Sequence, residues 1–427
     1  MDKVIEGKAF INGQFEDCCI GINNGKIVEI KKVLKGDENY KFKDRLIIPA
    51  GVDIHVHFRD PGMTHKEDFY TGSTAAAFGG ISCVCDMPNT IPQTTKIKVL
   101  DDKIKNASEK SVVDFGIYSG ISDNNIDDIE KLSDRSNGFK IYLGSTTNNL
   151  SFSNDNLKKA LFMISKTKKP VLFHAEDDSC LKKHKKKEQG LDDHLKNRPS
   201  VCEEIAIKNI ISSSQGLNLR SHICHLSSIE GLELLRNHPG GITCGATPHH
   251  LLLNVERKLK PENLFKVNPP IRTSFDRESL FNALKLGIIN ILESDHAPHT
   301  FDEKEQKFED IPSGIPGVET MYPIFLYLVK KEIFPLDRLI YAMCENPANL
   351  LNIPKGRIAI GMDADLIVIN LKEREFIKQE NLHSKCGFSP FNGWPSVFPD
   401  IVFIRGEKVI DEKEIQVKRG FGRFIGE

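Results

Sequence analysis

Residues 49–62 read PAGVDIHVHFRDPG, and this stretch decides how the chain is expected to fold. The run Leu46–His57 is largely apolar and contains several β-branched side chains, which predicts a buried strand. It ends in His55-Val56-His57, and because strand side chains alternate between the two faces, both imidazoles point the same way. The stretch therefore predicts a strand that presents two potential metal ligands at its C-terminal end.

Seven more runs of this kind follow along the chain, and helical patterns separate most of them. The further predicted strands are Ile81–Met87, Val112–Ser119, Phe139–Leu143, Val171–Ala175, Ser221–His225, Gly241–Ala246 and Ile289–Asp295. Helical periodicity marks Asn156–Ser165 and Cys202–Ile211, and the alanine-rich run Gly72–Phe78 stops at two glycines. This alternation predicts an α/β fold, a (β/α)8 TIM-like barrel that spans residues 49–354.

Short β-like runs with turn signals occupy both ends of the chain. Ala9–Phe15 is typical of a hairpin around Asn-Gly, and Ala364–Ile369 has the same character near the other end. Because chain ends often lie close together, we expect residues 1–48 and 355–427 to form one small β-sandwich domain.

The composition excludes several classes of protein. The 427 residues carry a net charge of −1, so no global field favours nucleic acid or an anionic membrane surface. No stretch reaches the roughly 18 apolar residues that span a bilayer, and the first residues lack an apolar signal core. The ten cysteines are scattered and indicate no disulfide framework, so we expect a protein of the reducing cytoplasm. Its expected partner is a small-molecule substrate.

Potential metal ligands end four of the predicted strands. His174, His225 and Asp295 close later strands as His55 and His57 close the first. Barrel chemistry sits at the C-terminal ends of the strands, so all five side chains are expected at one mouth. A single histidine on a strand usually has a structural role, either in the core with hydrogen-bond partners or on the surface. Four imidazoles and a carboxylate together, however, predict a site for zinc or a similar divalent ion.

Lys140 lies in the predicted strand Phe139–Leu143. Its ammonium form cannot bind a metal, because it has three donors and no acceptor. A buried lysine amine loses its proton readily and can then react with carbon dioxide. The resulting carbamate would be anionic, with two oxygens that could each hold one metal.

A series of motifs in this chain resembles the amidohydrolase superfamily and, within it, the type I dihydroorotases. The densest part is the stretch 49–62, which Lys66-Glu67-Asp68 follows. The further motifs, in chain order, are Met87-Pro88-Asn89-Thr90, Thr247-Pro248-His249-His250, Val267-Asn268-Pro269-Pro270-Ile271-Arg272 and Ser294-Asp295-His296-Ala297-Pro298-His299. The resemblance covers nearly the whole barrel.

The resemblance implies how the metal ligands divide. One metal would be held by His55, His57 and Asp295, and the other by His174 and His225. Lys140 stands where several type I enzymes have Asp, which implies the branch in which a carboxylated lysine and a hydroxide bridge two zinc ions.

The resemblance also implies the residues of the substrate pocket. They are His57, Arg59, Asn89, His299, Asn268, Ser313 and Gly314. The pair Ser313-Gly314 departs from the common Phe-Gly at its position. Thr146 and Thr147 match a threonine loop that is mobile in some of these enzymes.

The implied reaction is the reversible cyclisation of N-carbamoyl-L-aspartate to L-dihydroorotate with loss of water, the third step of de novo pyrimidine (UMP) biosynthesis. Asp295 would be the catalytic group that moves the proton. The fork of Arg59 suits bidentate binding of the substrate carboxylate. The resemblance leaves open a homo-oligomer and association with aspartate transcarbamoylase.

Two other functions stay open on the sequence. One is another cyclic amidohydrolase, an allantoinase or a hydantoinase, whose rings lack the orotate carboxylate. Arg59 argues against this alternative, because burying a guanidinium without its anion would cost considerable free energy. The other is a non-catalytic scaffold, which should have lost ligands that are all present here. A substrate panel separates the hydrolases, and a metal assay identifies a scaffold.

Overall fold

The computed structural model describes residues 1–144, 150–238 and 241–426. Its centre is an eight-stranded parallel sheet in which the strands follow one another in sequence order. These strands are β5 (Gly51–Val56), β6 (Ile81–Asp86), β7 (Asp114–Ile121), β8 (Gly138–Tyr142), β9 (Val171–His174), β10 (Ser221–Ile223), β11 (Ile242–Ala246) and β12 (Ile291–Leu292). A parallel bridge between Val56 and His296 joins the first strand to the segment after the last, so the sheet closes into a barrel.

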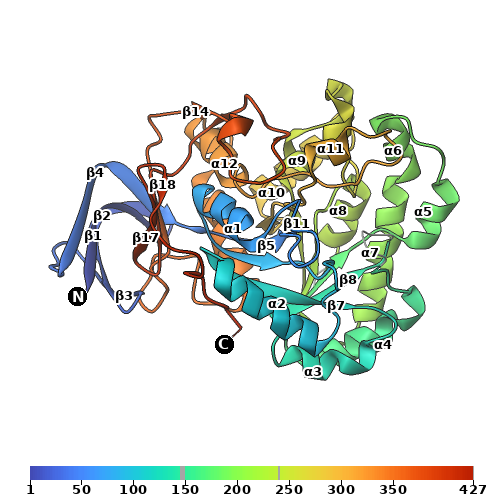
Figure 1. The fold of residues 1–427 in the computed structure, drawn as a ribbon, viewed down its shortest axis with the longest axis horizontal. Coiled ribbons are helices and arrows are strands. Elements are labelled where there is room, and N and C mark those ends of the chain that lie inside the picture. The colour runs from blue at the N-terminus through green and yellow to red at the C-terminus, as the bar shows by residue number, and fades with distance from the viewer. Residues whose placement is uncertain (145–149, 239–240, 427) are drawn as a thin grey trace.

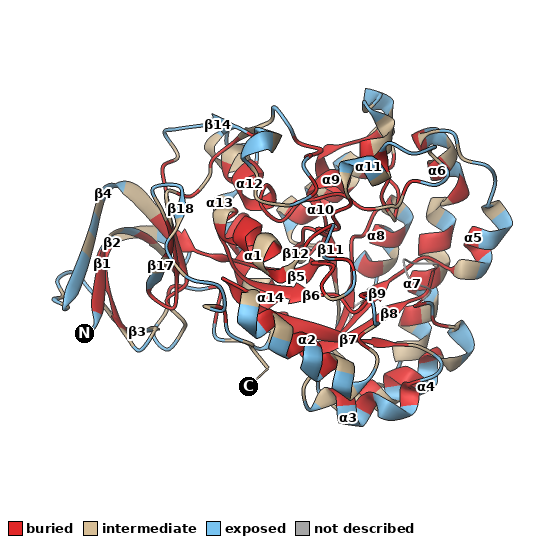
Figure 2. Cartoon of the chain, in the orientation of Figure 1, coloured by how far each residue is buried: buried red, intermediate tan, exposed pale blue. Residues whose placement is uncertain are grey.

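Helices surround this barrel, as Figure 1 shows. The main ones are α1 (Phe69–Phe78), α2 (Ile97–Lys110), α3 (Ile129–Ser133), α4 (Asn154–Ser165), α5 (Asp178–His184), α6 (Leu191–Asn197), α7 (Ser200–Ser214), α8 (Ile229–Arg236), α9 (Pro248–Leu252), α10 (Ser274–Leu286), α11 (Phe301–Lys304), α12 (Met321–Lys330), α13 (Leu336–Ile340) and α14 (Asn346–Leu351). Every residue of β5 to β9 is buried, as expected for parallel strands covered by helices (Figure 2). The predicted barrel is confirmed.

A second sheet is built from both ends of the chain. Its strands are β1 (Lys3–Ile11), β2 (Gln14–Asn23), β3 (Lys26–Lys31), β4 (Glu38–Pro49), β13 (Leu366–Ile369), β16 (Ile401–Ile404), β17 (Glu407–Asp411) and β18 (Glu414–Ile415). Ile5 and Ile20 from one end share a separate hydrophobic core with Leu366 and Phe403 from the other. The β domain from both ends is thereby confirmed. Its strands are joined in one continuous hydrogen-bonded order, because β4 pairs with both β1 and β13.

Part of the C-terminal region returns to the barrel. β14 (Glu375–Phe376) pairs with β15 (Pro395–Ser396), and β15 packs beside α12. The backbone of Phe115 in β7 exchanges hydrogen bonds with Arg423 and Ile425. Residues 355–427 therefore contact both domains, and the boundaries at 48/49 and 354/355 stay predictions.

The predicted strand Leu46–His57 is divided at Ala50, with its first residues in β4 of the second sheet and the rest in β5 of the barrel. Two later barrel strands are also shorter than predicted. β10 ends before His225 and β12 ends before Asp295. Both residues have positive φ, 38° at His225 and 46° at Asp295, which takes the chain out of the strand conformation. Alternation of apolar residues cannot reveal this change of backbone direction.

A buried cluster of charges joins the two domains. Lys355 Nζ lies 2.7 Å from Asp114 Oδ2 of the barrel and 2.7 Å from Asp365 Oδ2 beside the β domain, with Asp363 Oδ2 at 3.0 Å. Arg405 pairs with Asp114 from the end of β16. Burial opposes the charge on Lys355, but the three carboxylates hold its pKa well above its usual range.

The cysteines depart from the sequence prediction at one pair. Cys180 in α5 and Cys202 in α7 form a disulfide across a sequence separation of 22. Cys18, Cys19, Cys83 and Cys85 are free, as predicted. The spacing of Cys180 and Cys202 gave no signal, because only the packing of α5 against α7 brings them together.

Within the described parts of the chain, no helix combines the length and the apolar character that crossing a membrane requires.

The charge cluster makes a prediction about stability. Lys355→Met leaves the buried carboxylates of Asp114 and Asp365 without the cation that they share, so we expect the free energy of unfolding to fall by about 3–5 kcal/mol. Urea denaturation followed by circular dichroism measures this change. Lys158→Met, an exposed site on α4, is the matched control and should shift the free energy by less than about 0.5 kcal/mol. Equal stability of the two variants would contradict a role of the cluster in joining the domains.

Candidate active site

The strand ends bring the predicted metal ligands to one pocket. His55 lies in β5, His174 ends β9 and His57 follows β5 directly, whereas His225 and Asp295 stand two and three residues beyond the ends of β10 and β12. The pocket is lined by His55, His57, Arg59, Asn89, Tyr142, His174, His225, Val267, Asn268, Asp295, Ala297, Ser313 and Gly314. Lys140 and His299, also predicted, lie directly behind this lining.

Three of these residues have left-handed backbone conformations. Arg59, His225 and Asp295 have φ of 60°, 38° and 46°. Such conformations cost about 1–3 kcal/mol in a residue with a Cβ atom and concentrate at functional sites. The strained turns aim all three side chains into the pocket just beyond the strands.

Asp295 lies between the two histidines of the first strand. Its Oδ1 is 3.3 Å from His55 Nε2 and 3.2 Å from His57 Nε2. Burial alone would raise the pKa of Asp295, but His55 and His57 hold it well below its usual range. Asp295 is therefore a carboxylate at neutral pH and can accept a proton.

The outer nitrogens of these histidines also have partners. His57 Nδ1 donates to Asn89 Oδ1 at 2.7 Å, since an amide oxygen can only accept. His55 Nδ1 lies 3.4 Å from Glu293 Oε2, and Glu293 also accepts a hydrogen bond from the backbone of His225. Such outer partners orient metal-binding imidazoles. Here they leave both Nε2 atoms directed at Asp295.

The two histidines differ in protonation. Burial lowers the pKa of His57 to about 3, so this imidazole is neutral. Burial and Lys140 oppose protonation of His55 too, but Cys224, Asp295 and Glu293 outweigh them and raise its pKa to about 10. A cation at this site would take the place of the proton on His55.

His174 and His225 form the second half of the site. His174 Nδ1 is 3.1 Å from His225 Nε2, and His174 Nε2 is 2.7 Å from Glu176 Oε2. Arg198 Nε donates to Glu176 Oε1 at 3.0 Å, and Arg198 keeps the pKa of Glu176 low against the effect of burial. Across the described residues, His225 Nδ1 is buried without a hydrogen-bond partner. Both rings line the pocket.

Lys140 is fully buried beneath these residues. Its Nζ lies 3.0 Å from Cys224 Sγ and 5.1 Å from the centre of the Tyr142 ring. Ligand atoms of His55, His225 and Asp295 lie within 4.8 Å of one another, close enough to share a metal ion. The donor set therefore fits a divalent cation, with Lys140 in reach of the same space.

Arg59 is buried at the mouth of the pocket. Its Nε donates to Pro298 O at 3.1 Å, and its Nη2 lies 3.2 Å from His299 Nε2. His299 Nδ1 accepts from Lys66 Nζ at 3.1 Å. Among the residues that the structure describes, Arg59 forms no direct ion pair, and burial lowers its pKa although Asp295 and Asp86 favour its charge from a longer distance. A buried guanidinium in this situation calls for an anion from outside the protein.

The predicted loop Ser313-Gly314 reaches the pocket as well. Ser313 O is 3.1 Å from His299 Nε2, and Gly314 has φ of 144°. A Cβ atom at Gly314 would lie 2.5 Å from Ala297 O, so only glycine fits here. Asn268 Oδ1 is buried in the pocket with no partner in the described chain. Thr146 and Thr147 lie outside the described residues.

Sequence reasoning missed several functional neighbours. Glu176 and Glu293 each stand two residues from a predicted ligand, so strand alternation could have placed them beside His174 and Asp295. Tyr142 follows Lys140 by the same spacing. Arg198 gave no signal, because its approach to Glu176 depends on how the segment between α5 and α7 folds back.

Comparison with known proteins agrees with this geometry. Residues 46–409 match the model of the Amidohydrolase family. This chain belongs to the amidohydrolase family. Its relatives include the dihydroorotase of Thermoplasma acidophilum, 40% identical over 100% of this chain and 98% of the relative, and that of Methanosarcina acetivorans, 38% identical over 98% and 94%. Among solved structures, L-hydantoinase from Arthrobacter aurescens matches with a TM-score of 0.95 at 26% identity and 99% coverage of both chains.

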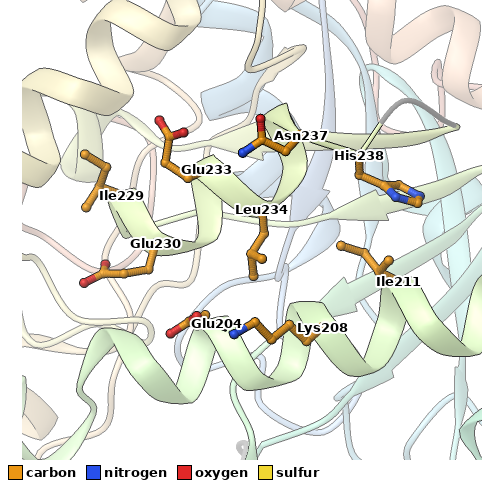
Figure 3. Close-up of a pocket in the computed structure, with 9 residues that line it drawn as sticks. All are labelled: Glu204, Lys208, Ile211, Ile229, Glu230, Glu233, Leu234, Asn237 and His238. Carbon is orange, nitrogen blue, oxygen red and sulfur yellow. Dashed lines mark hydrogen bonds and ion pairs between the residues drawn. The ribbon is translucent and has the colours of Figure 1, made fainter.

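This amidohydrolase also has a hollow of about 660 Å³ on its outer surface, between α7 and α8. Figure 3 shows its lining, which includes Glu204, Lys208, Glu230, Glu233 and Leu234. It shares no residue with the strand-end pocket. Its lining also contains Asn237 and His238, but none of the groups of potential metal ligands in the described parts of the chain lies in it, so the strand-end pocket is the candidate active site of this family member.

Lys304 supports the pocket from behind. Its Nζ donates to Pro312 O at 2.8 Å and to Lys266 O at 3.3 Å, which holds the backbone next to Ser313. The side chain is fully buried, and burial lowers its pKa to about 7. Lys304 is thus partly uncharged at neutral pH.

The shifted pKa of Lys304 predicts a pH dependence of stability. Between pH 7 and about 10.5 the unfolded chain holds a proton on Lys304 that the folded chain has lost, so this residue makes stability rise with pH in that window. In Lys304→Met this part of the rise should be absent. Urea denaturation at pH 7.5 and 9.5 compares the two proteins, with the exposed Lys307→Met as control. The same pH slope in Lys304→Met and wild type would show that Lys304 stays charged when folded.

Proposed function

We propose that this protein is a dihydroorotase that closes N-carbamoyl-L-aspartate to L-dihydroorotate, and opens it again, at a site of two zinc ions bridged by carboxylated Lys140. The observation that carries the substrate assignment is Arg59, a buried guanidinium at the mouth of a pocket of metal-ligand side chains. The full-length likeness to dihydroorotases at 33–40% identity supports the same reaction.

Two sets of residues would hold the metals. His55, His57 and Asp295 offer one set of donors, and His174 and His225 offer the other. When bound, paired zinc ions would polarise the reacting carbonyl and supply hydroxide near neutral pH. Carboxylated Lys140 would supply an anionic ligand with two oxygens to these metals, and its Nζ is buried beside Cys224.

The chain's own groups would position the substrate and move the proton. Arg59, with His299 behind it, would hold the substrate carboxylate. In ring opening, Asp295 would take the proton of the attacking hydroxide and deliver it to the leaving nitrogen, and in closure it would receive the proton of the ureido nitrogen. Because its pKa is low, Asp295 is ionised at neutral pH and enters the reaction without a proton. The remaining walls of the substrate pocket would be formed by Asn89, Asn268, Ser313 and Gly314.

The second candidate, hydantoinase-type activity, draws on the likeness to L-hydantoinase. The identity of 26% is well below the 40% to a dihydroorotase, and a hydantoin ring brings no carboxylate to Arg59. A cytoplasmic location is part of our proposal. So is assembly into a homo-oligomer or with aspartate transcarbamoylase, which light scattering of the chain alone and mixed with that enzyme would test.

The direct test is ring opening by the purified protein, followed by ultraviolet absorbance with dihydroorotate, allantoin and dihydrouracil side by side. We expect loss of dihydroorotate alone. Turnover of dihydrouracil or allantoin in its place would favour the second candidate. Two bound metals without turnover of any substrate would require a different cyclic amide.

Arg59→Lys tests the carboxylate site. A lysine keeps the charge but loses the bidentate fork, so we expect KM for dihydroorotate to rise more than about tenfold with normal metal content. Steady-state kinetics and metal analysis by mass spectrometry measure the two quantities. The exposed Arg374→Lys should behave as wild type. An unchanged KM would remove Arg59 from the substrate site.

Asp295→Asn tests proton transfer. An amide cannot take up the proton, so we expect kcat to fall by at least about 10²–10⁴-fold. The exposed Asp302→Asn is the control. Substantial turnover in a fully metal-loaded Asp295→Asn would mean that another group moves the proton.

A further inference from the structure

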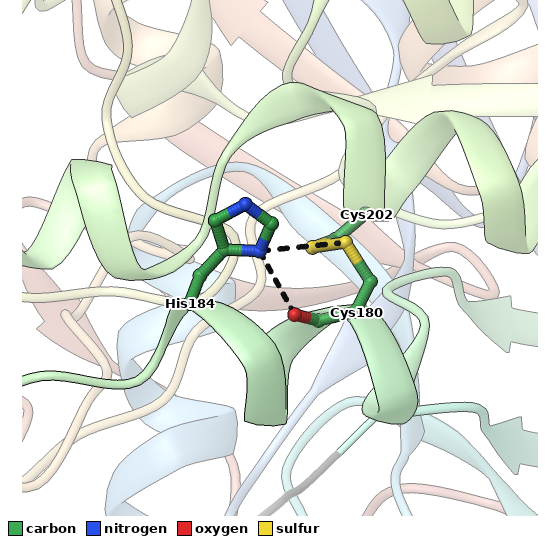
Figure 4. Close-up of side chains that lie close together, drawn as sticks. All are labelled: Cys180, His184 and Cys202. Carbon is green, nitrogen blue, oxygen red and sulfur yellow. Dashed lines mark hydrogen bonds between the residues drawn. A yellow bond between two sulfur atoms is a disulfide. The ribbon is translucent and has the colours of Figure 1, made fainter.

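The disulfide closes a segment that lies against the active site. Cys180 is in α5 and Cys202 is in the first turn of α7, with their Cα atoms 5.3 Å apart (Figure 4). Both residues are buried, with 5% of Cys180 and none of Cys202 exposed. The bond thus ties together the two ends of residues 180–202.

The first end of this segment begins right after the second half of the metal site. Asp177 N donates to Cys202 O at 2.9 Å, and Asp177 Oδ1 accepts from Cys180 N at 2.8 Å. Asp177 is the neighbour of Glu176, which lies 2.7 Å from His174. The backbone around the disulfide is therefore continuous with the carboxylate that orients His174.

The second end carries the counter-ion of that carboxylate. Arg198 stands four positions before Cys202 and donates to both oxygens of Glu176. Its backbone carbonyl in turn accepts from Arg272 at 3.0 Å. Arg198 contacts Glu176, and Glu176 contacts His174. The disulfide therefore links the segment after β9, which carries Glu176, to the start of α7, which Arg198 precedes.

The middle of the segment reaches the pocket wall at another point. His194 Nε2 lies 3.0 Å from the carbonyl oxygen of Val267, which lines the pocket. Glu188 pairs with Lys266 at 3.0 Å and with His194 at 3.1 Å. Loosening the segment would therefore disturb two sides of the active site.

We propose that Cys180 and Cys202 form a reversible thiol–disulfide site, open to dithiol reductants, whose oxidised form holds Glu176 and Arg198 so that His174 is fixed for metal binding. Glu176 and Arg198 are positioning residues in this scheme. The inference rests on the proposed metal site, but it adds a covalent control point outside that site.

The exchange balances without any further reactant. A thiolate of the dithiol attacks one protein sulfur, which breaks the Cys180–Cys202 bond and forms a mixed disulfide. The second thiolate of the reductant then closes its own disulfide and releases the protein sulfur. Two electrons and two protons pass to the protein, which ends with two thiols. Cys180 is the expected point of attack because it keeps the only exposure of the pair.

The bond itself is tested by counting thiols. The full chain is purified without reductant and alkylated in denaturant, and each cysteine is identified by mass spectrometry. We expect Cys180 and Cys202 to be protected and to become labelled after treatment of the native protein with dithiothreitol. Labelling of both before any reduction would overturn the proposal, whatever the enzyme's substrate.

The link to His174 is tested by metal release. Zinc-loaded protein, reduced with a phosphine and desalted, is mixed with a chromogenic chelator. Loss of an outer partner of a metal ligand typically weakens binding 10–100-fold, so we expect release of one zinc to be at least about tenfold faster after reduction. Cys180→Ser and Cys202→Ser should release zinc at the fast rate with or without reductant, and circular dichroism checks that they fold.

Cys244→Ser is the matched control, since Cys244 is buried and free in β11. It should keep the slow release when oxidised and the fast release when reduced. An equal rate in oxidised and reduced wild type would overturn the link to His174. A third zinc ion found only in the reduced protein and lost in Cys180→Ser would also overturn it, because Cys180, His184 and Cys202 would then be a metal site of their own. Failure to bind any zinc would instead refute the proposed metal centre.

Discussion

The closure of the barrel is the constraint on which the rest of the structure depends. His57 N donates to His296 O at 2.8 Å, and Val56 bridges to the same residue. This contact joins the first strand to the segment after the last one. Without it, His55 and His57 would lie far from Asp295, since about 240 residues separate them along a chain that can place them together only by closing a ring.

Closure then brings charged groups together in the buried interior of the barrel. His55, His57, Asp295, Glu293 and Lys140 are all buried. Buried ionisable groups are costly unless they have partners, and here each has one: Glu293 faces His55, Asn89 faces His57, and Cys224 faces Lys140. The partners that stabilise these buried groups also direct Nε2 of His55 and of His57 toward Asp295 in the pocket. The same contacts therefore contribute both to the stability of the fold and to metal binding.

Much of the fold was predictable because strands and turns have local causes. The apolar runs predicted all the barrel strands within a few residues, and the motifs around His55 and Asp295 placed the ligands at their ends. The errors lie at the predicted strand Leu46–His57, which is divided between β4 and β5, and at β10 and β12, where the backbone of His225 and Asp295 turns to positive φ. Hydrophobic periodicity indicates which face of a strand is buried, but it does not reveal that the backbone of a single residue has left the strand conformation.

The sequence by itself determined the order of elements, the residue types at the strand ends and the likeness to the amidohydrolase family, because these depend on near neighbours in the chain. Tertiary structure alone decided which groups stand behind the ligands. Glu293 meets His55, Arg198 meets Glu176, and Cys180 meets Cys202 because folding brings distant segments into contact. Those contacts are set by packing between elements, which leaves no periodic pattern in the sequence.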